Sequence, residues 1–149
     1  MANSIQYAKI VSVPSEKVDT NELTGRVRVA FAEYEAATEQ STITMFTIPN
    51  GARLLSATVS HDALNTSTTL SVGNGAYTNA AGTAVALDVD AYKAAAASTA
   101  ATSSDALVTM ALGKNAVVNA NEDGLPVTVT LAGADGAGTI QLQMFYVLD

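Results

Sequence analysis

The sequence contains no cysteine and no tryptophan among its 149 residues. The absence of cysteine excludes disulfides, thiolate metal sites and thiol nucleophiles together, and it is compatible with a reducing compartment. Aromatic residues make up only 5% of the chain, although 48% of it is hydrophobic. A chain of this size and composition can bury a core, and that core must be built from Ala, Val, Leu and Ile.

Charged residues are also scarce, at 14% of the chain against roughly 25% in an average soluble domain. The formal net charge is −7, and most of the excess negative charge lies in residues 61–149. Arg26 and Arg28 form the densest basic feature. Nucleic-acid binding is therefore not expected, because neutralising phosphates requires clusters of Lys and Arg.

Long apolar runs are missing as well. No window approaches the roughly 18 uninterrupted apolar residues that a membrane helix needs, so no membrane span is expected. The first residues, MANSIQYAKI, lack a charged region followed by a long apolar stretch. No signal peptide is therefore expected.

What the sequence does contain is apolar and polar alternation with a period of two, which is typical of half-buried strands. Arg26 and Arg28 alternate with valines at the start of one such stretch. The apolar members of the main stretches are Val27, Val29 and Phe31; Leu55, Ala57 and Val59; Leu70 and Val72; Val127, Val129 and Leu131; and Ile140, Leu142 and Met144. Many of these residues are β-branched, which favours strands.

Turn residues separate these stretches, with PNG at 49–51, GNG at 73–75 and NEDG at 121–124. Short strands at such spacing indicate an antiparallel sandwich or barrel. We predict an all-β protein with an antiparallel, jelly-roll-like β-sandwich. Residues 15–149 are expected to form this single domain, and residues 1–14 an apolar, strand-like N-terminal arm that ends at a proline.

The run DAYKAAAASTAATSSDA, at residues 90–106, interrupts the alternation. Asp90 is a residue type that caps helices, and alanine has the highest helix propensity. We therefore predict a short Ala-rich helix, or an ordered loop, packed on the sandwich.

The only histidine, His61, is followed directly by Asp62. A catalytic triad or a metal site would need further partners, and the sequence has no G-x-S-x-G motif, no cysteine and no second histidine. We interpret His61 as a strand-end residue and Asp62 as a turn residue.

Three other acidic motifs are candidate sites by residue type. Asp88 and Asp90 lack the spacing of a calcium loop, and residues 119–124 form a polar turn. Glu33 and Glu35 lie on one side of a strand, but glycoside hydrolysis would also need a cleft with aromatic sugar platforms. We predict no catalytic residue, no metal, no cofactor and no enzyme activity.

The segments GRVRVAFAEYEA, IPNGARLLSATVSHDALNTSTTLSVGNG and PVTVTLAGADGAGTIQLQMFYV resemble small virion proteins of tailed bacteriophages, similar to capsid decoration (cement) proteins. The resemblance covers most of the chain. It implies a sandwich bound to the exterior of an icosahedral capsid and assembled in the cytoplasm of a bacterial host. The implied partners are the major capsid protein and further copies of this chain, as a homotrimer or homodimer.

In this interpretation the arm and the less acidic first half contact the shell or a neighbouring copy, and the acidic second half faces outward. The expected contact residues are Ile5, Tyr7, Ile10, Arg26 and Arg28. Two alternatives remain open: a tail, fibre-base or head-spike component, and a small carbohydrate-binding sandwich. The tyrosines do not fall on one strand face, which disfavours the second alternative.

Overall fold

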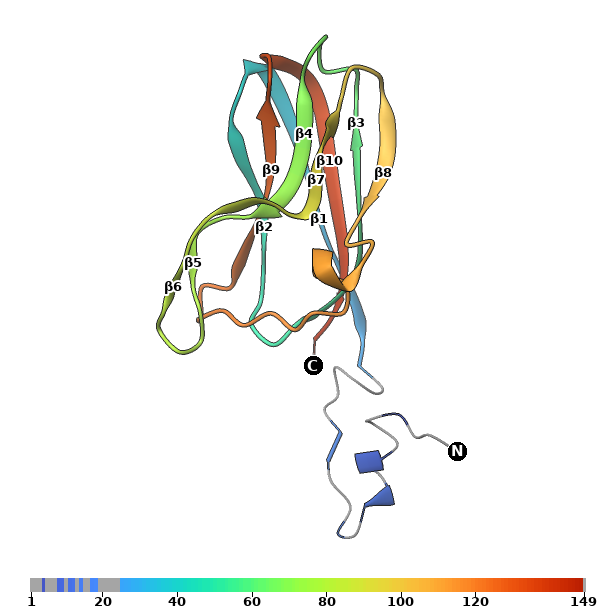
Figure 1. Cartoon of the computed structure of the whole chain (residues 1–149), viewed down its shortest axis with the longest axis vertical. Coiled ribbons are helices and arrows are strands. Elements are labelled where there is room, and N and C mark those ends of the chain that lie inside the picture. Colours follow the sequence, from blue (N-terminus) through green and yellow to red (C-terminus); the bar gives the residue numbers. More distant parts are fainter. Residues whose placement is uncertain are drawn as a thin grey trace.

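Residues 25–148 form two four-stranded antiparallel sheets packed against each other, with a small two-stranded sheet at one end (Figure 1). The computed structural model also describes eight earlier residues, namely Ser4, Ala8, Lys9, Val11, Ser12, Pro14, Lys17 and Val18. The strands are β1 (Val27–Glu39), β2 (Thr42–Ile48), β3 (Arg53–His61), β4 (Thr69–Asn74), β5 (Tyr77–Thr78), β6 (Ala84–Val85), β7 (Asp88–Ala97), β8 (Thr102–Ala106), β9 (Leu125–Ala132) and β10 (Gly136–Val147). A single 3₁₀ turn, η1 (Met110–Leu112), lies between β8 and β9.

The strand order is β1-β10-β3-β8 in the first sheet, called sheet A here, and β2-β9-β4-β7 in the second, sheet B. When the β5–β6 hairpin is set aside, the eight long strands run 1-8-3-6 in sheet A and 2-7-4-5 in sheet B. This is the strand order of a jelly roll, in which successive strands alternate between two sheets except for the fourth and fifth, which pair within one sheet. The expected all-β, jelly-roll-like sandwich is confirmed.

The core lies between the two sheets and is largely aliphatic. In sheet A the inward positions of β10 are Ile140, Leu142 and Met144, each 0% exposed. In sheet B the inward positions of β9 include Val127 and Val129, also 0% exposed. The period-two pattern therefore identified the buried side of these two strands correctly.

β1 departs from this pattern, because its large apolar residues face solvent. Val27, Val29 and Phe31 are 62%, 54% and 58% exposed. The opposite side of the strand carries Ala30, which is partly buried, and Ala36, which is 2% exposed. The predicted alternation is present, but from Ala30 onward the inward side of this strand consists of alanines and the partly buried Tyr34.

The predicted Ala-rich helix or loop was wrong, because residues 88–106 form two strands. β7 pairs with β4 at the edge of sheet B, and β8 pairs with β3 at the edge of sheet A. Tyr92 in the middle of β7 is buried. Asp90 caps no helix, and its N–H donates to Asp88 Oδ1 at 3.3 Å. Sheet pairing and the burial of Tyr92 outweigh the helix propensity of alanine.

The N-terminal residues that the structure describes also differ from the expectation. Ala8, Lys9 and Val11 are helical, and the Ala8 N–H donates to the Ser4 carbonyl at 2.9 Å. A strand-like arm is therefore wrong at these positions. The domain boundary between residues 14 and 15 stays a prediction, since most residues around it lie outside the described part of the chain.

Candidate functional site

His61 is the last residue of β3, and only 9% of its surface is exposed. Its Nδ1 lies 2.7 Å from the backbone oxygen of Asp62. Because a carbonyl oxygen can only accept, Nδ1 carries the proton in this bond. The imidazole is thus held by its own neighbour at a strand end, which is the position expected from the sequence.

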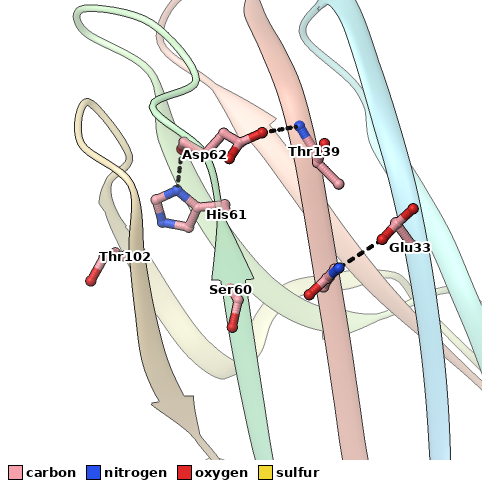
Figure 2. A pocket seen from close by; sticks show the side chains of 7 residues that line it. Glu33, Ser60, His61, Asp62, Thr102 and Thr139 are labelled. Atoms are coloured by element: carbon pink, nitrogen blue, oxygen red, sulfur yellow. Dashed lines mark hydrogen bonds between the residues drawn. The ribbon is translucent and has the colours of Figure 1, made fainter.

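Asp62 ties the end of β3 to β10 (Figure 2). Its N–H donates to the Thr139 carbonyl at 3.0 Å, and its Oδ2 accepts from the Thr139 N–H at 3.0 Å. Gly138, the preceding residue, has φ +134°, and a Cβ there would lie 3.1 Å from the Asp62 Cβ. The carboxylate therefore has a structural role in closing this end of sheet A.

No catalytic constellation surrounds His61 in the described residues. The nearest serine in sequence, Ser60, donates its Oγ to Ser103 Oγ at 2.9 Å. No group of three or more His, Asp and Glu side chains in the described part of the chain could hold a metal ion. A nucleophile activated by His61 would need a hydroxyl pointing at the ring, and in the described part of the chain the ring is bonded to the Asp62 backbone oxygen instead.

A polar hollow of about 400 Å³ lies beside this histidine, over the outer side of sheet A (Figure 2). Its lining residues are Glu33, Ser60, His61, Asp62, Thr102, Thr139 and Gln141. A neighbouring hollow of about 100 Å³ shares Ser60 and Gln141 and extends to Phe31. Together the two hollows form a shallow polar trough across β1, β10, β3 and β8.

Glu33, which lines this trough, and Glu35 share one side of β1, as expected, and each accepts a hydrogen bond from a residue of β10. Gln141 Nε2 donates to Glu33 Oε2 at 2.6 Å, and Thr139 Oγ1 donates to Glu35 Oε2 at 2.7 Å. Glu33 and Asp62 both line the hollow, but each carboxylate accepts a hydrogen bond from β10, Glu33 from Gln141 Nε2 and Asp62 from the Thr139 N–H. Glycoside hydrolysis requires two carboxyl groups directed at a substrate. The trough therefore offers hydrogen-bond acceptors to a partner, while its two carboxylates already have partners within sheet A.

A further hydrogen bond near the end of β1 changes the pKa of both its members. The Tyr34 hydroxyl donates to Glu39 Oε1 at 2.7 Å, and Ser41 Oγ donates to Glu39 Oε2 at 3.1 Å. The bond between them raises the pKa of Tyr34 and lowers the pKa of Glu39. It is strongest with the proton on the tyrosine and the charge on the carboxylate.

The buried Tyr92 on β7 shows a different effect. Burial raises the pKa of its hydroxyl, and electrostatic repulsion from neighbouring acidic groups, including the Asp88 carboxylate, raises it further. This tyrosine therefore stays neutral over the physiological pH range. Its role is to fill the core beneath β7, which is consistent with its 6% exposure.

The predicted contact residues are only partly placed by the structure. Arg26 and Arg28 are exposed where the chain enters β1. Ile5, Tyr7 and Ile10 lie outside the described residues. The structure does not bring the arm and the two arginines into one described surface, so the set stays a prediction.

The expected separation of a less acidic first half from an acidic second half is not found in sheet A, where β10, from the second half, lies between β1 and β3, from the first. In sheet B three of the four strands, β9, β4 and β7, come from the second half. Which face of the sandwich meets a shell stays a prediction. The charges of sheet A instead differ along β1, from Arg26 and Arg28 at its start to Glu33, Glu35 and Glu39 further on.

The remaining acidic motif is a turn bonded within itself. Asn121 Nδ2 donates to Asp123 Oδ2 at 2.8 Å, and the Asp123 N–H donates to Asn121 Oδ1 at 3.1 Å. A hollow of about 370 Å³ beside this turn includes one aromatic residue, Tyr77. A single tyrosine does not make the aromatic row on which sugars stack, so this hollow gives no support to carbohydrate binding.

Sequence reasoning missed the exposed apolar side of β1. A signal was present, because the residues that alternate with Val27, Val29 and Phe31 include Ala30 and Ala32. Because both sides of this strand carry apolar residues, the sequence alone does not show which side faces the core. Only the pairing with β10 shows which side faces the core.

The fold recurs in chains of solved phage capsids. A chain in the capsid of Ralstonia phage GP4 aligns with a TM-score of 0.63 at 23% identity, covering 84% of this chain and 86% of that chain. A chain in the cyanophage Pam1 capsid asymmetric unit aligns with a TM-score of 0.59 at 22% identity, with the same coverage of 84% and 86%. A chain in the acidic stable capsid structure of Helicobacter pylori bacteriophage KHP30 gives 0.51 at 16% identity, covering 82% and 87%.

At these identities the similarity shows a shared fold. No protein-family model and no curated protein matches the chain. In the part of the chain that the structure describes, no helix has both the length and the apolar character needed to cross a membrane.

Proposed function

We propose that this chain is a structural virion protein of a tailed bacteriophage, which binds the outer surface of the capsid and stabilises it by bridging major capsid subunits. The observation that carries the proposal is the recurrence of its fold in chains of three phage capsids. The alignments cover similar shares of both chains, so the matched chains are about as long as this one.

The chemistry of the trough supports a role without a reaction. Its potential reactive groups already have partners: His61 bonds the Asp62 carbonyl, Ser60 bonds Ser103, and Glu33 accepts from Gln141. Catalysis would require these groups to be directed at a substrate. Hydrogen-bonding groups on a sheet surface instead suit contact with other proteins.

The proposed mechanism is an increase in contact area between shell subunits. Each copy that touches two adjacent subunits adds an interface that must be broken before they separate under the outward pressure of packaged DNA. We propose that the arm residues Ile5, Tyr7 and Ile10, together with Arg26 and Arg28, make these contacts. The protein would assemble as a closed homo-oligomer, since closed symmetry limits growth to a defined number of copies.

The copy number per purified virion tests the proposal, measured by quantitative mass spectrometry against the major capsid protein. A ratio near one per capsid subunit, or a simple fraction of it, supports a shell-covering decoration protein. A ratio of a few per cent would instead support a tail, fibre-base or head-spike component. Absence from the virion would contradict the structural role, and glycan-array binding would then favour the carbohydrate-binding alternative.

A further inference from the structure

The sandwich contains two asparagines that are followed directly by glycine, Asn50 and Asn74. Such pairs are prone to spontaneous deamidation, in which the backbone nitrogen of the next residue attacks the side-chain carbonyl carbon. Glycine has no side chain to obstruct this attack and reaches the required backbone angles at little cost. By residue type, these two asparagines would be the preferred sites of the reaction.

The fold hinders the attack at Asn50, because the attacking nitrogen and the target amide are both bonded elsewhere. The Gly51 N–H donates to the Val118 carbonyl at 2.9 Å. The Asn50 Oδ1 accepts from the Ala120 N–H at 3.2 Å. Both bonds must break before the Gly51 nitrogen can reach the side chain of Asn50.

The fold hinders the attack at Asn74 more strongly. Asn74 is the last residue of β4, which lies between β9 and β7 in sheet B, and it is 8% exposed. The Gly75 N–H donates to the Pro126 carbonyl at 2.9 Å, and Asn74 Nδ2 donates to the Gly75 carbonyl at 3.1 Å. The reaction here would require neighbouring strands to separate.

Asn65 has the opposite arrangement, because its side chain already faces the nitrogen that would attack it. It is exposed and lies in the connection between β3 and β4, at the end of the sandwich away from the C-terminus (Figure 1). The Thr66 N–H donates to Asn65 Oδ1 at 2.7 Å. The carbonyl carbon Cγ is bonded to this oxygen, so a small rotation of the amide brings the two reacting atoms together.

The surrounding residues hold Asn65 in this position. Asn65 Nδ2 donates to the Asp135 carbonyl at 2.9 Å. The preceding residue, Leu64, is buried, and its N–H donates to the Ser98 carbonyl at 2.9 Å. Thr68 is also fully buried. The chain is therefore fixed on both sides of Asn65, and a fixed geometry close to that of attack accelerates a reaction.

The Thr66 hydroxyl provides a second contact to the same oxygen. Its Oγ1 donates to Asn65 Oδ1 at 3.4 Å, which is a long hydrogen bond. Negative charge develops on Oδ1 during the attack, and a donor directed at that oxygen stabilises the charge. By residue type alone, the β-branched threonine would slow the attack through crowding. The fold therefore favours the reaction at a pair that the residue types disfavour.

We propose that Asn65 is the residue at which the folded sandwich deamidates, ahead of the two Asn–Gly pairs. Hydroxide from solvent removes the proton of the Thr66 nitrogen, which bonds to Asn65 Cγ as the Cγ–Nδ2 bond breaks. The side-chain nitrogen takes a proton from water and leaves as ammonia, and a cyclic succinimide remains. Water adds to either ring carbonyl and opens the ring to aspartate or isoaspartate, without any oxidation or reduction.

The product loses a hydrogen bond and gains a negative charge. An ionised aspartate has no N–H to donate to the Asp135 carbonyl, so the contact between the two loops weakens. This inference goes beyond the proposed function and does not depend on it, because it concerns a slow chemical change within the chain itself.

Peptide mapping by mass spectrometry on the purified full chain tests the proposal. One series is kept folded in mildly alkaline buffer and another is kept in concentrated urea, and conversion at each asparagine is followed over time. We expect Asn65 to convert before Asn50 and Asn74 in the folded chain, and after them in urea. Faster conversion of either Asn–Gly pair in the folded chain would overturn the proposal. So would an Asn65 rate that is no higher in the folded chain than in urea.

Thr66→Val is the matched variant, because it keeps the β-branched shape and the backbone N–H and removes only the hydroxyl. In the folded chain we expect conversion at Asn65 to slow by about threefold or more, and in urea to stay the same. Thr69→Val is the control, since the Thr69 hydroxyl donates to the Ala132 carbonyl and not to Asn65. Equal folded-state rates for Thr66→Val and the unaltered chain would show that the hydroxyl has no part in the reaction.

These experiments use the purified chain without shells. A negative result would therefore contradict only the assignment of Asn65. Absence of the protein from virions would contradict only the proposed function.

Discussion

Asp62 and Thr139 exchange two hydrogen bonds at the end of sheet A, one through the Asp62 backbone N–H and one through its carboxylate, each 3.0 Å long. The carboxylate thereby supplies an acceptor for the Thr139 N–H just beyond the point where β3 ends. Gly138 is required next to this contact, because its φ of +134° and the 3.1 Å approach to Asp62 disfavour any side chain. The aspartate after the only histidine is therefore explained by the fold.

Replacing this carboxylate should destabilise the sandwich slightly. We expect Asp62→Ala to lower the free energy of unfolding by about 1 kcal/mol, since the Thr139 N–H loses its acceptor at a position that water partly reaches. Asp62→Asn keeps a carbonyl oxygen and should lose less. Urea denaturation of both variants measures the difference. Equal stability of Asp62→Ala and the unaltered chain would show that the bond contributes nothing.

Gly73 should be much less tolerant of alanine than Gly82. A Cβ at Gly73 would lie 2.0 Å from the Asp88 carbonyl oxygen and 2.5 Å from the Val89 carbonyl carbon, so β4 and β7 would have to move apart. We expect Gly73→Ala to cost about 2–4 kcal/mol.

Gly82→Ala is the control, since nothing lies within 4 Å of a Cβ there and only the φ of +81° resists the substitution. It should cost about 1 kcal/mol. Thermal unfolding followed by circular dichroism compares the two variants, and similar melting temperatures would contradict the close approach of β4 and β7.

Most of the sandwich could be predicted from the sequence, because the alternation of apolar and polar residues within a strand is a local pattern. In β9 and β10, large aliphatic residues alternate with Thr or Gln, so the buried side follows from the pattern alone. The turn at residues 49–51 likewise contains a glycine with φ +80°, which its residue type anticipates. Such features need no knowledge of which strands pair.

The failures occurred where pairing decides the outcome. Residues 94–97 are all alanine, which favours a helix locally, yet they lie in β7 because β4 supplies a neighbouring strand. The orientation of β1 depends on β10, which lies more than 100 residues later in the chain. The hollow beside His61 could not be predicted for the same reason, since Glu33 and Gln141 meet only through that pairing.

The bond between Tyr34 and Glu39 should give a pH-dependent contribution to stability. The lowered pKa of Glu39 means that this contribution is present above the ordinary carboxyl value and is lost as pH falls through the folded-state value. The raised pKa of Tyr34 means that it is present below the ordinary value of 10.0 and is lost as pH rises through the folded-state value.

We therefore expect Tyr34→Phe to lower the urea midpoint between about pH 5 and about pH 9, with a smaller difference below about pH 4. In a Glu39→Gln background the Tyr34→Phe difference should lose this dependence on acid pH, which a double-mutant cycle measures. A difference that is constant from pH 3 to pH 7 would show that the two groups are not coupled.

Removal of residues 1–13 tests whether the arm contributes to shell binding. The sandwich begins at Val27, so the truncated chain should retain its β-sheet circular dichroism. Under the proposed function we expect its affinity for shells to fall at least about 30-fold, the equivalent of losing one interface side chain worth about 2 kcal/mol. Co-sedimentation with shells that lack the protein measures the affinity.

The His61→Ala variant is the comparison, because a side chain that is only 9% exposed offers little contact area. This variant should bind shells nearly as well as the unaltered chain. A truncated chain that saturates shells as the full chain does would make the arm hypothesis wrong. A large loss of binding by His61→Ala would instead identify the trough beside it as a contact surface.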